Sequence, residues 1–259
     1  MKIEKPHAEK LASIGYLKDI ERAARVCYCS ETKGNTEEFV NKLIVNGHYR
    51  PLEFGTLYIT LPYTEKFIKF IDDISHNRYS KVEMYNGIAY ITTNYRVIAE
   101  MHEHWVIEAS RLYNIANNIS GKTEYHNDRK TVKWTISRGI ADEFRTHTMI
   151  SSLMQSTRYC NYSKDKFDNQ ITFIRPSWFD DNKNRWKRIV MKTAWWFSEK
   201  FYLLLIKMGC KAQEARDVLP LGIKTELIQS AFENDWESFI EQRSSVAAHP
   251  DARHIVASL

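Results

Sequence analysis

Residues 138–164 read RGIADEFRTHTMISSLMQSTRYCNYSK, and this stretch says more about the fold and chemistry of the chain than any other. Arginines stand here among serines, threonines and tyrosines, a composition that is not typical of a buried helix. An arginine guanidinium can hold a phosphate through two parallel N–H bonds, and hydroxyl groups can bind the remaining oxygens. Ser156-Thr157-Arg158 therefore suggests a phosphate-binding site. A solvated helix face with unpaired arginines explains the same composition equally well.

The whole chain has the composition of a folded globular protein. Of its 259 residues, 43% are hydrophobic and 13% aromatic, which excludes disorder as the main state. The net charge of +5 is too small to indicate a nucleic-acid-binding protein, but it suits anionic small-molecule ligands. The strongest apolar run, residues 201–206, is far shorter than the ~20 residues that span a bilayer. The N-terminus lacks the apolar segment of a secretory signal, so we expect a cytoplasmic protein without a membrane partner.

The chain contains four cysteines, Cys27, Cys29, Cys160 and Cys210, which are too few for a disulfide-stabilised fold of this length. None of them forms a C-x-x-C pair, so no metal site is expected. We predict reduced and buried thiols, because free cysteine packs as a small hydrophobic residue.

Helices and strands are predicted in an order without a β-α-β rhythm. Apolar residues spaced by three or four predict helices over residues 8–28, 35–47, 98–117 and about 181–209. Alternating apolar residues predict strands over residues 57–61, 87–98, 132–136 and 170–175. The last 50 residues suggest short helices, broken at Pro220 and Pro250. This order favours a single α+β domain over residues 1–259, with a mixed or antiparallel sheet and flanking helices.

The spacing within residues 138–164 resembles the signature of the flavin-dependent thymidylate synthases, the ThyX family. That signature has an Arg-His-Arg triplet, seven further residues, and then Ser-x-Arg-Tyr. Here Thr146-His147-Thr148 is followed after seven residues by Ser156-Thr157-Arg158-Tyr159. Other blocks resemble the family in the same order along the chain: RAARVCY at 22–28, GHYRPLE at 47–53, ARDVLP at 215–220, WESFIEQR at 236–243 and AAHP at 247–250. Residues 62–130, which lie outside these blocks, are expected to be an insertion into a ThyX-like domain.

The resemblance implies an enzyme that methylates dUMP at C5 to give dTMP. It implies FAD as cofactor, methylenetetrahydrofolate and NADPH as co-substrates, and a homotetramer whose active sites combine chains. In the family, reduced flavin delivers a hydride to the pyrimidine after the carbon transfer, and no cysteine adds to the ring. The protein then supplies orientation and charge stabilisation.

Individual residues match the positions at which the family holds its ligands. The resemblance assigns the dUMP site to Gln155, Ser156, Thr157, Arg158, Arg216 and Arg243. Arg243 is expected to be catalytic, because a fixed cation beside the uracil would stabilise negative charge developing on the ring. The resemblance assigns the FAD site to His48, Glu53 and His147. For His48 and Glu53, a helix-cap or core hydrogen-bonding role is an equal alternative.

Some family positions are changed in this chain. Thr146 and Thr148 replace both arginines of the triplet, which removes two fixed charges expected near FAD. Arg145 stands one residue early, and on a helix a shift of one residue rotates a side chain by about 100°. Further departures are Met154, Phe232 and Asn234. We therefore expect FAD to bind more weakly than is usual in the family.

Two alternatives to a working flavin-dependent enzyme stay open. One is a diverged ThyX homologue, with weak or no flavin binding, that binds or differently modifies a pyrimidine nucleotide. The other is a transferase that uses Cys160 as its nucleophile, although no neighbouring residue is evidently placed to lower the pKa of that thiol.

Overall fold

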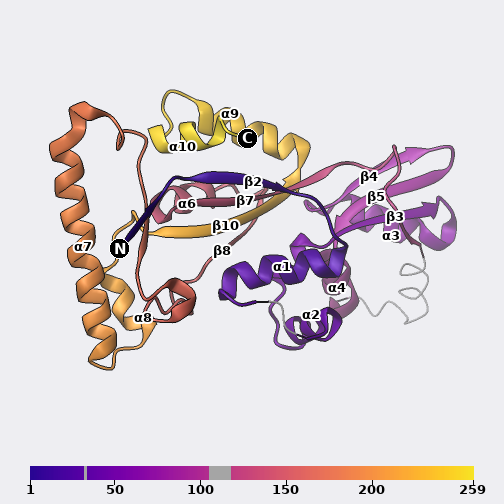
Figure 1. The fold of residues 1–259 in the computed structure, drawn as a ribbon. Helices are drawn as coiled ribbons and strands as arrows, with labels where there is room; N and C mark the ends of the chain where they lie inside the picture. The colour runs from indigo at the N-terminus through magenta and orange to yellow at the C-terminus, as the bar shows by residue number, and fades with distance from the viewer. Residues whose placement is uncertain (32–33, 105–117) are drawn as a thin grey trace.

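The computed structural model describes residues 1–31, 34–104 and 118–259, and it has the predicted α+β architecture (Figure 1). A four-stranded antiparallel sheet lies at its centre, in the order β2-β7-β10-β8. Its strands are β2 (His7–Leu11), β7 (Arg129–Ser137), β10 (Lys224–Phe232) and β8 (Ser151–Met154). Strands β7 and β10 pair along their whole length and form the middle of the central sheet.

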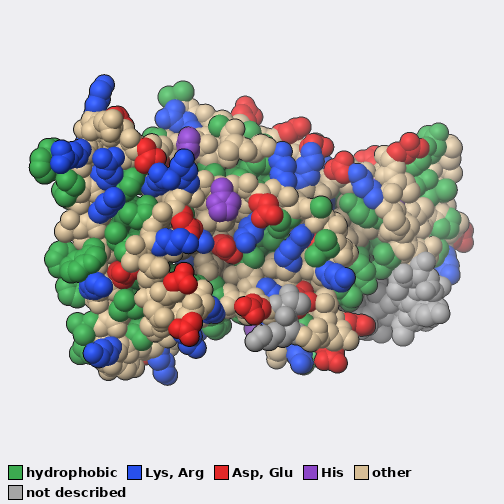
Figure 2. Space-filling view, in the orientation of Figure 1, with side chains coloured by type: hydrophobic (Ala, Val, Ile, Leu, Met, Phe, Trp, Pro, Cys, Tyr) green, Lys and Arg blue, Asp and Glu red, His purple; other side chains and the backbone are tan. Residues whose placement is uncertain are grey.

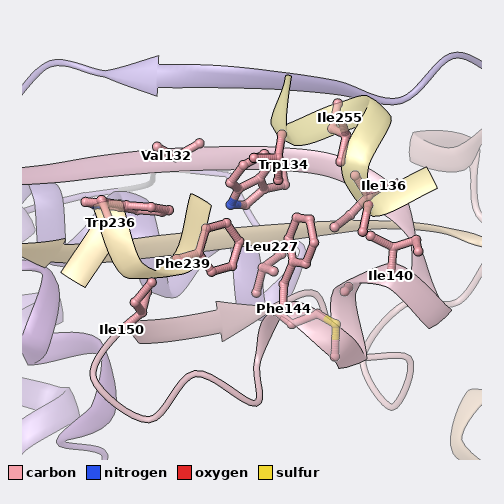
Figure 3. Close-up of a cluster of buried hydrophobic side chains, with 14 of the residues drawn as sticks. Val132, Trp134, Ile136, Ile140, Phe144, Ile150, Leu227, Trp236, Phe239 and Ile255 are labelled. Atoms are coloured by element: carbon pink, nitrogen blue, oxygen red, sulfur yellow. The ribbon is translucent and has the colours of Figure 1, made fainter. Parts of the chain in front are cut away.

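One face of the central sheet carries the largest core. Trp134 of β7 is fully buried and meets the rings of Phe144 and Phe239, at centroid distances of 5.0 and 5.9 Å (Figure 3). Phe144 belongs to helix α6 (Arg138–Phe144) and Phe239 to helix α9 (Glu233–Ser244), which is followed by α10 (Pro250–Val256). This packing fixes α9 against the segment that follows α6, and both later contribute to the site.

A second antiparallel sheet, in the order β4-β5-β3-β6, lies beside the central one (Figure 1). It comprises β3 (Thr56–Pro62), β4 (Lys81–Tyr85), β5 (Ile88–Asn94) and β6 (Ile119–Ser120), with helices α3 (Glu65–Ser75) and α4 (Tyr95–His104). Leu57, Ile59 and Leu61 alternate along β3 and are all buried in a separate hydrophobic cluster. The predicted insertion, residues 62–130, therefore shares its core with β3, which precedes it.

Helix α7 (Arg185–Lys207) lies at the opposite end of the molecule (Figure 1). Its 23 residues extend for about 34 Å. Trp195 packs on Phe173 of β9 (Thr172–Ile174), with stacked rings 4.9 Å apart. Strand β9 pairs in parallel with β1 (Lys2–Glu4), which makes the set of sheets mixed, as predicted. No helix in the described part of the chain has both the length and the apolar character needed to span a membrane.

Helices α1 (Tyr16–Tyr28) and α2 (Thr36–Val45) cover the junction of the two larger sheets and lead into the short helix η1 (Arg50–Phe54). Asn35 caps α2 by accepting a hydrogen bond from the Glu37 backbone N–H, which confirms the predicted start of that helix. The remaining short helices are η2 (Asp165–Phe167), η3 (Asn182–Asn184), α8 (Ala212–Ala215) and η4 (Arg216–Val218).

Three predicted elements need correction. The helix predicted over 8–28 begins only at Tyr16, because residues 7–11 pair with β7 as an edge strand. The strand predicted over 87–98 ends at Asn94, where α4 begins. The helix predicted over 98–117 is thus observed up to His104, and its remainder lies outside the described residues.

A further correction concerns the last 50 residues, which are not all helical. Residues 224–232 form β10, the strand between β7 and β8. Most of its side chains are buried on both faces, so the segment lacks the alternation that marks a half-buried strand. Strand β8 was not predicted either, since its four residues are too short to show a period.

Candidate active site around the Ser156–Cys160 loop

The loop from Ser156 to Cys160 follows β8 and is anchored to the end of α1. The backbone carbonyl of Ser156 accepts hydrogen bonds from the N–H groups of Tyr159 and Cys160, at 3.0 and 3.1 Å. The Ser156 N–H itself donates to the Cys27 carbonyl at 3.1 Å. These bonds close a tight turn from which the Arg158 side chain projects into solvent. Within the described residues, Arg158 forms no ion pair, so its guanidinium is free to meet an anion.

Arg216 reaches the same loop from η4. Its Nη1 lies 3.4 Å from the Thr157 hydroxyl, although the two residues are 59 positions apart in the sequence. Its nearest carboxylate is that of Asp217, at 3.9 Å and largely exposed, and an exposed pair of this length contributes little. The Arg216 side chain is 40% exposed. The structure thus brings Arg216 to the loop that carries Ser156, Thr157 and Arg158, with the Arg216 guanidinium next to the Thr157 hydroxyl.

Gln155 lies beneath this loop and is held by the protein. Its amide nitrogen donates to the Cys29 sulfur at 2.6 Å, and its amide oxygen accepts from the Glu226 N–H at 3.3 Å. Its backbone carbonyl accepts a hydrogen bond from Arg138. Gln155 therefore supports the loop from below, whereas the sequence predicts it as a ligand of dUMP.

A pocket of about 570 Å³ opens beside Gln155, between α1 and the central sheet. Its lining includes the cations Lys18, Arg22, Arg25, Lys133 and Lys166 and the acids Glu21, Glu31 and Glu226. Several of these cations are already paired: Arg22 with Asp19, Arg25 with Glu21, and Lys133 with Glu226, at 2.7, 2.9 and 3.2 Å. Lys18 and Lys166, which also line the pocket, form no ion pair among the described residues, so unpaired positive charge lies both at the loop and in the pocket.

Arg243 of α9 lies against the segment that replaces the family triplet. Its Nε donates to His147 Nε2 at 2.9 Å, and its Nη2 donates to the Thr146 hydroxyl at 2.9 Å and the Glu143 carbonyl at 2.6 Å. The Glu143 carboxylate lies 3.5 Å from Nη1, and the Arg243 side chain is only 12% exposed. The predicted catalytic arginine is thus largely occupied by its own chain.

These contacts fix the charge state of His147. Because arginine can only donate, His147 Nε2 must accept, so the ring is neutral and carries its proton on Nδ1. Burial and the Arg243 charge both lower the pKa of His147. Its ring packs edge-on against Phe239, with centroids 4.8 Å apart. Arg243 therefore provides the cation in a segment that has lost both arginines of the triplet.

His48 lies in a different group of side chains, next to the Ser156–Cys160 loop. Its Nδ1 shares a 3.0 Å hydrogen bond with the Tyr28 hydroxyl. Tyr28 in turn meets Tyr159 edge-on, at a centroid distance of 5.6 Å. His48 and Tyr159 are exposed, so the three rings form an accessible aromatic surface beside Arg158.

Glu53, the third residue predicted to bind FAD, is not accessible to a ligand. Its side chain is 3% exposed and its carboxylate pairs with Arg96 of α4 at 2.5 Å. Its backbone carbonyl accepts a hydrogen bond from Arg129 at 3.2 Å. The carboxylate neutralises a cation at the junction of the two larger sheets, which is the core role that the sequence left open.

The residues predicted to bind FAD do not form one site within a single chain. No hydrogen bond or ring contact among the described residues joins the group around His48 to the group around His147. Glu53 is covered by Arg96, and Arg243, which lies against the altered triplet, is bonded internally, whereas Arg145 beside Thr146 is 42% exposed. As they stand in one chain, these residues fit a flavin poorly.

Cys160 is placed badly for a nucleophile. It is fully buried, and a hydrogen bond with Cys29 together with burial raises its pKa. Only a thiolate attacks carbon readily, so a buried thiol with a raised pKa is a weak candidate. All four cysteines are free. No cluster of ligands able to hold a metal ion occurs in the described residues.

Sequence reasoning assigned no ligand-binding role to Tyr28, the last residue of the block at 22–28, or to Cys29, which directly follows it. Tyr28 contacts His48, and Cys29 contacts Gln155. The resemblance of RAARVCY to a family block indicated that this helix end contributes to the site. The contacts of Tyr28 and Cys29, however, involve residues far away in the chain. Spacing alone could not reveal them.

Comparison with protein families identifies the region that contains this site. The family model described as thymidylate synthase complementing protein matches residues 128–259. That region holds the strands β7, β8 and β10, the Ser156–Cys160 loop, Arg216 and Arg243. A comparison with curated proteins finds no match. Because the family model covers half of the chain and includes the core of the site, the protein belongs to the thymidylate synthase complementing protein family, the ThyX family of thymidylate synthases.

Proposed function

We propose that this protein is a flavin-dependent thymidylate synthase that methylates dUMP at C5 to give dTMP. Methylenetetrahydrofolate would supply the carbon and NADPH the reducing equivalents, with FAD as cofactor. The observation that supports this most is the contact between Arg216 and Thr157, because it joins two separate family blocks into one anion-binding site. A nucleotide monophosphate carries the doubly charged group that two free guanidiniums would bind.

In this proposal the loop binds and orients the nucleotide. Arg158 and Arg216 would hold the phosphate, with the Ser156 and Thr157 hydroxyls as further partners. The aromatic rings of Tyr28 and Tyr159 lie next to that anchor and would flank a flat ring. Bound flavin would supply the hydride chemistry, and the chain's own groups would orient the reactants and stabilise charge.

Arg243 would act on the uracil through a fixed positive charge. Its bonds to His147, Thr146 and Glu143 hold the guanidinium in one position, so no reorganisation is needed when charge develops on the ring. Burial and the Arg243 charge lower the pKa of His147, which favours a neutral ring beside the guanidinium. The Glu143 carboxylate at 3.5 Å opposes this, and a substrate would have to compete with it.

We also propose that the enzyme works as a homotetramer with shared sites, and helix α7 supports this. Its inner face buries Trp195 and Tyr202, whereas its outer face exposes further large apolar side chains along the left edge of Figure 2. They are Trp186, Ile189, Val190, Trp196, Phe197, Phe201, Leu204 and Met208. A helix that is apolar on both faces is normally covered on both. A second copy of the chain would cover the outer face, and assembly would bring together flavin contacts that one chain keeps apart.

A second candidate function is a diverged homologue that binds a pyrimidine nucleotide with little or no flavin. The covered Glu53 carboxylate and the internally bonded Arg243 favour it, since both reduce the groups available to FAD. It shares the phosphate site with the first proposal, so nucleotide binding does not separate the two. Flavin binding and dTMP turnover separate the two proposals.

The deciding experiment measures dTMP formation by the full chain with dUMP, methylenetetrahydrofolate and NADPH, with and without excess FAD. The visible spectrum of the purified protein shows in parallel whether oxidised flavin is bound. FAD-dependent dTMP formation supports the first proposal. Binding of dUMP without turnover, even in excess FAD, would reject it in favour of the second.

A further inference from the structure

The pocket between α1 and the central sheet carries more positive than negative charge. Five cations and three acids line it. Three of the cations are paired with carboxylates, whereas Lys18 and Lys166 form no ion pair within residues 1–31, 34–104 and 118–259. Both lysines are exposed. An anionic ligand could therefore reach either ammonium group without first breaking an ion pair.

Lys166 belongs to the end of the pocket that adjoins the Ser156–Cys160 loop. Its ammonium donates to the Cys29 carbonyl at 2.7 Å. The Cys29 side chain in turn accepts a hydrogen bond from Gln155, the residue that directly precedes the loop. An ammonium has three N–H donors, so two of those of Lys166 are left for a ligand. A molecule bound at the loop could thus extend into the pocket past this lysine.

Lys18 lies far from Lys166 along the same helix. It stands in the first turn of α1, whereas Cys29, the partner of Lys166, directly follows the last residue of that helix. Lys18 and Cys29 are 11 positions apart, which corresponds to about 16 Å along the helix axis. A single phosphate group is too small to bridge that distance, even allowing for the reach of the lysine side chain. A chain that carries several separate anionic groups can do so.

We propose that this pocket binds the oligoglutamate tail of the folate co-substrate, with carboxylates of the tail at Lys166 and Lys18. The proposal rests on the proposed function, because it takes methylenetetrahydrofolate as the carbon donor. It adds a subsite for a chain of glutamyl residues joined through their side-chain carboxyl groups. The first glutamyl residue, next to the folate rings, would lie at Lys166, and later ones would reach Lys18.

The other lining residues suit a peptide-like chain better than a phosphate. Each glutamyl residue brings a carboxylate, an amide N–H and two methylene groups. The Glu31 carboxylate lines the pocket and forms no ion pair in the described part of the chain, so it can accept from an amide N–H. Ile14, which is 54% exposed, and Phe167 add apolar surface for the methylene groups. A fully ionised phosphate has no donor to offer Glu31 and would be repelled by it.

The number of glutamyl residues should therefore affect the affinity for folate. A pair of opposite charges exposed to water strengthens binding by up to about fivefold. We expect a folate with three glutamyl residues to bind about three- to fivefold more tightly than the same folate with one. Salt screens such pairs, so the preference for the longer tail should shrink as the NaCl concentration rises from about 50 to 500 mM.

Calorimetric titration of the full chain tests the proposal. Tetrahydrofolate with one or three glutamyl residues is titrated without oxygen, in excess FAD and dUMP. Tetrahydrofolate lacks the carbon to be transferred, so binding is measured without turnover. Lys18→Glu should remove the preference for three glutamyl residues and leave the Kd of the shorter folate unchanged. Lys166→Glu should weaken the binding of both folates, because its lysine contacts the first glutamyl residue.

Lys164→Glu is the matched control. Lys164 is exposed, lies two residues before Lys166 and does not line the pocket. The variant changes the net charge as much as Lys18→Glu does, but it should keep the preference of the parent. Equal loss of the preference in Lys164→Glu and Lys18→Glu would overturn the proposal, because net charge alone would then explain the effect.

Two results in the other proteins would also contradict the subsite. They are equal affinity of the parent for the two folates, and a Lys18→Glu variant that keeps the preference. An assay of dTMP formation separates this proposal from the proposed function. Formation of dTMP without any preference for the longer tail rejects the subsite alone. A preference that depends on Lys18, in a protein that makes no dTMP, supports the subsite and rejects the synthase.

Discussion

Replacing Arg243 by alanine removes the cation that links α9 to the altered triplet. The guanidinium makes three hydrogen bonds, to His147, Thr146 and the Glu143 carbonyl, and is mostly shielded from water. A hydrogen bond to a charged group contributes about 1.5–3 kcal/mol, and bonds through one group do not add fully. We expect Arg243→Ala to lower the free energy of unfolding by about 2–4 kcal/mol. Urea denaturation measures this loss, and the slope of the unfolding free energy against urea concentration should be the same in both proteins.

The same variant should change the titration of His147. Arg243 contributes to the lowered pKa of His147, so in Arg243→Ala this pKa should rise towards the ordinary histidine value. A folded-state pKa below the unfolded one stabilises the protein above the unfolded pKa, and this stability is lost as pH falls through the folded pKa. Arg243→Ala should therefore lose less stability than the parent on acidification below the ordinary histidine pKa. An NMR pH titration of the His147 imidazole signals shows whether its pKa rises in Arg243→Ala.

Arg145→Ala is the matched control for Arg243→Ala. Arg145 lies in the same segment but is 42% exposed, and its pair with Asp142 at 3.3 Å is also exposed. Such a pair contributes at most about 1 kcal/mol. Equal losses of stability in the two variants, or an unchanged or lower His147 pKa in Arg243→Ala, would refute the assigned role of Arg243.

Three further predictions concern flavin, the chemical step and assembly. Thr146→Arg combined with Thr148→Arg should tighten FAD binding in a fluorescence titration, and unchanged or weaker binding would mean that the segment no longer serves a flavin. Cys160→Ala should keep the rate of dTMP turnover within about threefold of the parent rate, whereas Arg243→Ala should lower this rate by about a hundredfold. A Cys160→Ala variant that folds and binds dUMP but makes no dTMP would favour a thiolate mechanism. Phe197→Asp with Phe201→Asp should dissociate the oligomer in light scattering, while Val45→Asp, on the exposed face of α2, should not; a parent that is already monomeric contradicts the proposed assembly.

Local patterns predicted the elements whose burial follows a regular period. Leu57, Ile59 and Leu61 alternate along β3 because one of its faces is covered, and the period is visible in the sequence. Helix α7 was predicted within a few residues, since no proline or glycine interrupts its 23 residues. The missed strands depend on partners. Strand β2, HAEKL, is held by pairing with β7, and β10 is buried on both faces between two neighbours.

The same distinction applies to the site. The resemblance to the ThyX family assigned Ser156, Arg158 and Arg216 to one nucleotide site, and the structure shows that Arg216 reaches the Ser156–Cys160 loop. The sequence could not show that Arg96, 43 residues after Glu53, would neutralise that carboxylate. Nor could it show that Arg243 would bond to a segment almost 100 residues earlier. Long-range ion pairs depend on how the two larger sheets and α9 pack together, and no local pattern encodes them.

The central claim is that Arg158 and Arg216 hold the phosphate of a nucleotide, and calorimetric titration of dUMP tests it most directly. Arg158→Ala and Arg216→Ala should each lose at least about 1.4 kcal/mol, a tenfold weaker Kd, because each removes a charge-assisted bond. Arg78 is an exposed arginine in the turn between α3 and β4, and Arg78→Ala should bind dUMP like the parent. Deoxyuridine, which lacks the phosphate, should bind the parent and the two loop variants equally. Losses below about 1 kcal/mol in both variants, or equal losses for dUMP and deoxyuridine, would contradict the phosphate site.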